Sequence, residues 1–168
     1  MLLIEIDKTR YRRHFNIVMG ACISFLLLGS LGIAQLLIAV FPAAEGTHFH
    51  WNLLGVIVTA LIILVVFKSK RQHPFLVEVV YVLELKKALN LITRKVRKLQ
   101  SAAKMGDPNA LLALQFSYSG SRQLWLLDDN TITLASLDKS QAELEQLLAK
   151  YDISIDITKY NSNLLKSF

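Results

Sequence analysis

The sequence predicts a mainly α-helical membrane protein. We expect a two-helix transmembrane hairpin, then a long juxtamembrane helix and a small cytoplasmic helical subdomain that has room for a short two-stranded β piece. Two observations support this fold class. Apolar residues make up 53% of the 168 residues and charged residues only 19%, whereas globular proteins carry about a quarter charged residues. Two long stretches also lack any formal charge, which indicates segments that face lipid.

The two uncharged stretches are the predicted spans. Residues 1–14 form a basic N-terminus, the first stretch covers residues 15–41, and the second covers residues 51–67. A span needs about 20 helical residues, so the first stretch is longer than necessary and the second barely long enough. Residues 42–50 contain helix breakers and polar side chains. They predict a short periplasmic loop that closes a hairpin.

The orientation follows from the basic residues beside the spans. The loop has no lysine or arginine, whereas Lys8, Arg10, Arg12 and Arg13 precede the first span, and Lys68, Lys70 and Arg71 follow the second. The positive-inside rule then places both termini in the cytoplasm of a bacterial inner membrane. A cleaved signal peptide is the alternative, but its apolar region is normally only about 7–15 residues long.

Small residues in the spans indicate helix packing. The spans contain no Asp, Glu, Lys or Arg, which disfavours an ion pathway. Small residues four positions apart lie on one helix face and let a neighbouring helix approach closely. The predicted packing residues are Gly20 with Ser24, Ser30 with Ala34, Gly55 with Thr59, and Gln35 as a hydrogen-bonding group. They favour association of the hairpin with itself or with another membrane protein.

Residues 68–105 are predicted to form a long basic amphipathic helix. After His73 and Pro74, residues 75–104 contain neither Gly nor Pro, and apolar residues recur at intervals of three or four. No acidic residue lies between positions 85 and 106, and the basic residues there are Lys86, Lys87, Arg94, Lys95, Arg97, Lys98 and Lys104. Three partners fit this charge: anionic lipid headgroups, the acidic C-terminal part of the chain, or nucleic acid. Nucleic acid is the weakest of the three, because no aromatic platform accompanies the charges.

Residues 106–168 are predicted to form the helical subdomain. Gly106 ends the long helix, Asp107 caps the next one, and Pro108 occupies its first position. We expect helices over residues 108–119 and 121–127, separated by a bend at Gly120. Capping-box spacings at Asp138 and Ser140 predict another helix to residue 151. Residues 131–134 and 153–157 alternate and could pair as strands, and the tail is expected to be helical.

Catalytic chemistry is not predicted. No histidine or cysteine follows His73, so cysteine or Ser-His-Asp catalysis is excluded from the cytoplasmic part, and we expect no enzyme activity and no cofactor. Asp128–Asn130 as a magnesium site, and Glu45 with His48 and His50 as a zinc or copper site, are both weak patterns, so we predict no metal site. Candidate partner-contact residues are Arg122, Gln123, Trp125, Asp128, Asp129 and Asn130; capping and core packing are the alternative roles.

Several stretches resemble an uncharacterised proteobacterial family of small two-span inner-membrane proteins, a domain of unknown function. The matching stretches are residues 4–13, 51–55, 73–75, 120–124 and 127–134. The resemblance covers nearly the whole chain. It implies the two-span topology and an inner-membrane location, and it implies no activity, cofactor or catalytic residue.

These observations predict an accessory or scaffold protein that binds another protein through its cytoplasmic helical domain. A membrane or cytoplasmic protein and the anionic lipid surface are its expected partners. Two alternatives remain open. A homo-oligomeric channel or transporter subunit would form defined oligomers, and a membrane-tethered nucleic-acid binder would use the basic helix.

Overall fold

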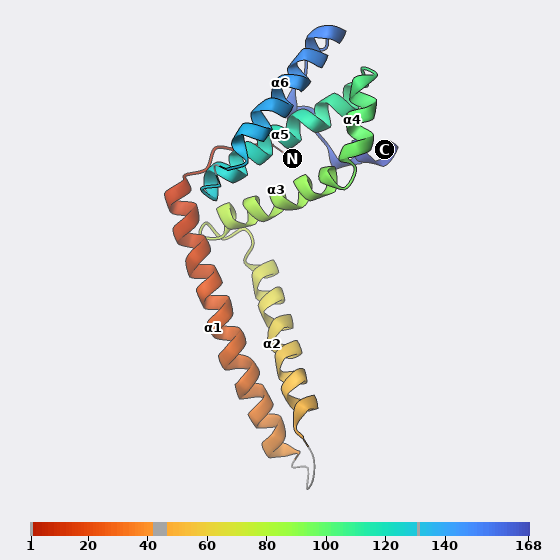
Figure 1. Ribbon diagram of the computed structural model, residues 1–168. Coiled ribbons are helices and arrows are strands. Elements are labelled where there is room, and N and C mark those ends of the chain that lie inside the picture. The colour runs from red at the N-terminus through yellow and green to blue at the C-terminus, as the bar shows by residue number, and fades with distance from the viewer. Residues whose placement is uncertain (1, 42–46, 131) are drawn as a thin grey trace. The chain divides into compact units, whose positions relative to one another are not determined.

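The computed structural model describes residues 2–41, 47–130 and 132–168. These residues form helices and no strand, which confirms the mainly helical fold class (Figure 1). The chain divides into a hairpin unit, Thr9–Val80, and a helical unit made of Met1–Lys8 with Tyr81–Phe168. The elements are α1 (Lys8–Val40), α2 (Phe49–Ser69), α3 (Val77–Thr93), α4 (Val96–Lys104), α5 (Pro108–Leu127), α6 (Leu134–Tyr151), and the 3-10 helices η1 (Ile157–Lys159) and η2 (Ser162–Ser167).

The hairpin unit consists mainly of α1 and α2, which lie side by side (Figure 1). Both helices are long and apolar enough to cross a membrane. The 33 residues of α1 correspond to a length of about 50 Å. Helix α1 begins at Lys8, so it takes in the second half of the basic N-terminus. Residues 42–46 of the expected loop lie outside the described residues.

The expected single helix over residues 75–104 is divided into α3 and α4. The break falls at Arg94 and Lys95. Neither residue is a glycine or a proline, so the local sequence does not predict a helix end there. Helix α4 buries Leu99 and Ala103 completely and packs against α5. The break therefore results from tertiary packing, which the local spacing of apolar residues does not reveal.

Helix α5 starts as the sequence predicts but ends later. The Asp107 carboxylate accepts hydrogen bonds from the amides of Asn109 at 2.8 Å and Ala110 at 3.0 Å, which confirms the cap. The expected bend at Gly120 is wrong, because the helix continues to Leu127. A Cβ at Gly120 would lie 3.1 Å from methyl carbons of Leu85 and Leu89. This glycine therefore lets α3 approach α5 closely.

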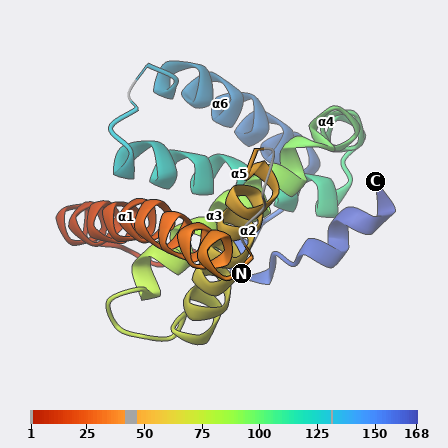
Figure 2. The ribbon, with the colours of Figure 1, turned by 90° about the horizontal axis from the view of Figure 1, so that it is seen from below.

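The C-terminal part also differs from the sequence prediction. The two-stranded piece does not form: residues 132–133 make a turn, Leu134 opens α6, and residues 153–156 are irregular, while Thr131 lies outside the described residues. Helix α6 begins before the capping boxes and packs beside α5 (Figure 2). The tail forms η1 and η2, and the ring of Tyr160 stacks on Phe116 with centroids 4.0 Å apart. Apolar contact with α5 thus decides the course of the tail.

We predict that Asp107→Ala lowers the free energy of unfolding of the helical unit by about 1 kcal/mol, because two amides lose their acceptor. Asp107→Asn, whose side-chain oxygen can still accept, should keep most of the stability. Thermal unfolding of the full chain in detergent, followed by circular dichroism, measures both. Equal losses in the two variants would contradict a capping role.

Alkaline pH should destabilise the helical unit. Burial raises the pKa of Tyr160, and burial together with the nearby Glu143 raises the pKa of Tyr118. Above pH about 10 the unfolded chain loses these phenolic protons while the folded chain retains them, so stability falls as pH rises. Tyr160→Phe should make this fall shallower between pH 9 and pH 11, about the range of tyrosine titration. An unchanged slope in chemical unfolding at these pH values would refute the assignment.

Candidate functional site

Helices α1 and α2 approach each other closely at a glycine. A Cβ at Gly55 would lie 2.5 Å from the backbone oxygen of Ser30 and 3.1 Å from the backbone nitrogen of Ala34. Thr59, one turn further, is completely buried and donates a hydrogen bond to the Gly55 oxygen at 2.7 Å. Four of the seven predicted packing residues therefore meet at one place.

The other predicted packing residues lie elsewhere. Gly20, Ser24 and Gln35 are exposed, and a Cβ at Gly20 would meet no atom within 4 Å. The structure adds Gly29, where a Cβ would lie 2.8 Å from the Thr59 methyl group. The spacing of small residues does not single out Gly29, because the residues four positions away, Phe25 and Ile33, are large.

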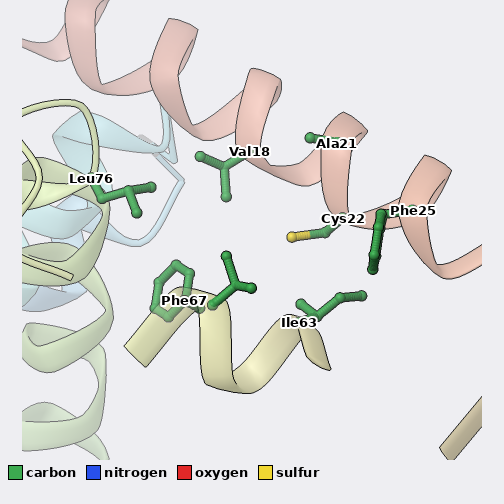
Figure 3. A pocket seen from close by; sticks show the side chains of 8 residues that line it. Val18, Ala21, Cys22, Phe25, Ile63, Phe67 and Leu76 are labelled. Carbon is green, nitrogen blue, oxygen red and sulfur yellow. The ribbon is translucent and has the colours of Figure 1, made fainter. Parts of the chain in front are cut away.

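Between α1 and α2 lies an apolar crevice with a volume of about 340 Å³. Figure 3 shows its side chains from both helices, with the sulfur of Cys22 pointing into the gap. The crevice is separate in sequence from the glycine contact, since it involves residues 18–25 of α1 and 63–67 of α2. Its lining residues are Val18, Ala21, Cys22, Phe25, Ile63, Val66, Phe67 and Leu76.

A polar cluster lies at the basic end of α1, also within the hairpin unit. The Glu78 carboxylate is 3.2 Å from the Arg10 guanidinium and 3.4 Å from Nδ1 of His14. The His14 ring packs on Phe75 with centroids 4.1 Å apart and is nearly fully buried. The sequence gives no sign of this cluster, because more than sixty residues separate its two halves. The cluster neutralises Glu78 and ties residues 75–78 to α1.

The N-terminal segment, residues 2–8, is part of the helical unit. The Ile4 amide donates to the hydroxyl of Tyr81 at 3.0 Å, and that hydroxyl donates to Oε1 of Gln123 at 3.1 Å. The Gln123 amide group in turn donates to the Ile4 oxygen, and Lys8 forms an ion pair with Asp129. The sequence contains no signal for this docking, because the segment lacks apolar periodicity.

The candidate partner-contact residues are therefore largely engaged within the chain. In addition to Gln123 and Asp129, Arg122 bonds to Asp138 and, at 3.0 Å, to Gln141. Asp128 pairs with Lys86 at 3.1 Å. Trp125 is half-buried and Asn130 is exposed. These polar side chains therefore contact other parts of the helical unit.

The seven basic residues of the predicted juxtamembrane helix fall into two groups. Lys86 pairs with Asp128, Lys95 donates to the Leu165 oxygen at 2.6 Å, and Lys98 donates to a Phe168 oxygen at 2.6 Å. Lys95 and Lys98 thus hold the last residues of the chain, and Lys86 holds the end of α5. The other four, Lys87, Arg94, Arg97 and Lys104, are exposed.

The structure brings together no metal-ligand set in the described part of the chain. A group of three or more His, Cys, Asp or Glu side chains suited to a metal ion is absent from these residues. Asp128 is engaged by Lys86 and Asp129 by Lys8. Glu45 lies outside the described residues, and so does the grouping of Glu45 with His48 and His50 that the sequence suggests.

We predict that Gly55→Ala destabilises the hairpin unit by about 1–3 kcal/mol, because the added methyl group would overlap backbone atoms of α1. The matched control is Gly32→Ala, since a Cβ at Gly32 meets no atom within 4 Å. Unfolding of the full chain in mixed detergent micelles, followed by loss of helix, measures both. Equal stability of the two variants would show that the contact is not needed.

Comparison with known proteins gives one match. The sequence model of the family described as "Protein of unknown function (DUF3087)" covers residues 1–165. No curated protein and no solved structure matches the chain. Because the family match spans nearly the whole sequence and both described units, the chain belongs to the DUF3087 family of proteins of unknown function.

Proposed function

We propose that the protein is an integral inner-membrane accessory or scaffold protein that binds another protein through its helical unit and has no catalytic activity of its own. Helices α1 and α2 form the membrane anchor in this proposal. Their length and hydropathy support insertion, and the basic residues that flank them support cytoplasmic termini.

The observation that carries this proposal is the exposure of two large apolar side chains, one in the last turn of α5 and one a few residues after it. Leu126 is 51% exposed, and Ile132, which follows the acidic residues Asp128 and Asp129, is 91% exposed. Leu126 also lines a shallow hollow with Ile6 and Gln123. A large apolar side chain left exposed beside a hollow is a feature of protein-binding surfaces. A partner segment that combines apolar side chains with hydrogen-bonding groups fits this surface.

The exposed basic side chains support a second contact. Lys87, Arg94, Arg97 and Lys104 lie on α3 and α4, and we propose that they meet anionic lipid headgroups. Each basic residue near such a surface contributes about 1 kcal/mol. The lipid would then hold the helical unit where its partner can reach it.

A homo-oligomer, including a channel or transporter subunit, is the second candidate. The observation that favours it is the open space at Gly20 and Gly32, where an added Cβ would meet nothing within 4 Å. A second hairpin could approach α1 closely at such positions. The described spans contribute no charged side chain between Phe15 and Val40 or between Phe49 and Phe67, so ion flux would need many copies.

Photocrosslinking in native membranes tests the proposed function. We predict that benzoylphenylalanine at Leu126 or Ile132 of the full chain gives one adduct of reproducible mass with another protein. The control position is Met105, which is 75% exposed but lies at the end of α4. With the probe at Leu126, Ile132→Asp should reduce the adduct about tenfold, which corresponds to losing one buried apolar side chain.

Three results would count against protein binding. Equal crosslinking from all three positions would indicate random encounters, and adducts with lipid alone would indicate that this surface faces the membrane. An adduct of twice the 19.0 kDa chain mass would favour the homo-oligomer, and ion flux in liposomes would then be measured.

A further inference from the structure

We propose that the crevice between α1 and α2 binds one acyl chain of an anionic phospholipid, whose headgroup lies on basic residues at the same end of the hairpin. This inference rests on the membrane insertion proposed above. It concerns a different surface from the protein-binding residues of the helical unit.

The shape of the hairpin unit supplies the first argument. Toward the loop the two helices lie close together: a Cβ at Gly55 would meet backbone atoms of Ser30 and Ala34, and a Cβ at Gly29 would meet the Thr59 side chain. Toward the opposite end, residues 18–25 and 63–67 leave a space of about 340 Å³ (Figure 3). Pockets that hold small organic ligands begin at about this size.

The chemistry of the walls supplies the second argument. All eight lining side chains are apolar or, for Cys22, weakly polar. Water in such a space would lack the two to four polar partners that it normally requires. Within a bilayer, the hydrocarbon nearest to the crevice is a lipid acyl chain, so a chain that enters between the helices completes their packing at no cost in hydrogen bonds.

Charge selects the headgroup. Lys68 follows Phe67 of the crevice directly, Lys70 lies two residues further, and Arg13 lies about one turn before Val18. Glu78 is the sole acidic residue in the described part of the hairpin unit, and Arg10 and His14 already contact it. The basic end therefore carries an excess of positive charge, which complements a lipid headgroup with a net negative charge.

Fluorescence quenching by brominated lipids tests the proposal. A Phe25→Trp variant places the probe in the crevice, in a background where Trp51 and Trp125 are replaced by phenylalanine. Leu28→Trp is the matched control on the same helix, since Leu28 is 74% exposed and is not a lining residue. Both full-length variants are placed in phosphatidylcholine vesicles that contain a small, equal fraction of brominated phosphatidylglycerol or brominated phosphatidylcholine.

We expect the crevice probe to be quenched several-fold more strongly by brominated phosphatidylglycerol than by brominated phosphatidylcholine, whereas the control should respond equally to both. Lys68→Gln and Lys70→Gln should each remove most of this preference, because the loss of one basic residue weakens headgroup binding about fivefold. Lys139→Gln and Lys150→Gln, on α6, serve as charge controls and should leave it unchanged.

Equal quenching of the crevice probe by both lipids would overturn the proposal. A control probe that no brominated lipid quenches would instead show that the hairpin is not inserted, which refutes the proposed function. Since a new tryptophan could disturb the fold, native mass spectrometry of the unmodified chain provides an independent measurement. Retention of one phosphatidylglycerol after delipidation is expected, and retention of none overturns the proposal.

Cys22 provides a test of the competing occupant. It is the single cysteine of the chain, and its sulfur points into the crevice (Figure 3). If a helix of a second copy filled the crevice, mild oxidation in the membrane would join two chains through Cys22. A disulfide-linked dimer would therefore overturn the lipid assignment, whereas a monomer that retains one anionic lipid supports it.

Discussion

Helix α5 carries apolar side chains on most of its sides, so other elements must pack around it to remove these side chains from water. Its buried residues include Leu111, Leu114 and Phe116, which face different directions around the helix. Helices α4 and α6 pack against it, as do η1 and η2, and α3 reaches it through Gly120. A small unit can bury enough apolar surface in this way because one helix serves as the common core. The break between α3 and α4, the length of α5 and the path of the tail all follow from this constraint.

Polar contacts then determine what remains on the surface of the helical unit. Gln123 and Tyr81 hold the backbone at Ile4, while Asp128 and Asp129 each pair with a lysine. Hydrogen bonds of this kind fix the position of a segment more than they add to stability. They also occupy the polar groups that would otherwise be available to a partner. Apolar side chains such as Leu126 and Ile132 are left exposed, and these carry the proposed protein contact.

The hairpin unit combines one tight contact with one open region. Gly55 brings two backbones together, and the bulkier side chains of the basic end leave a crevice between the same two helices. Such an arrangement can bind a molecule without any change in the helices themselves. A structural lipid and a protein partner would then have separate surfaces, so loss of one need not abolish the other. This separation suits an anchor that presents a small binding unit at a membrane.

Local patterns in the sequence determined the helical class, the two apolar helices and the start of α5 at Asp107 and Pro108. They also singled out Ser30, Ala34, Gly55 and Thr59, because small residues four apart must share a helix face. Only the tertiary structure decided the break at Arg94, the straight passage of α5 through Gly120, and the docking of Ile4 on Gln123. Each of these depends on residues far apart in the chain. Hydropathy and helical spacing describe a segment's own faces, and they contain no information about which distant segment will cover them.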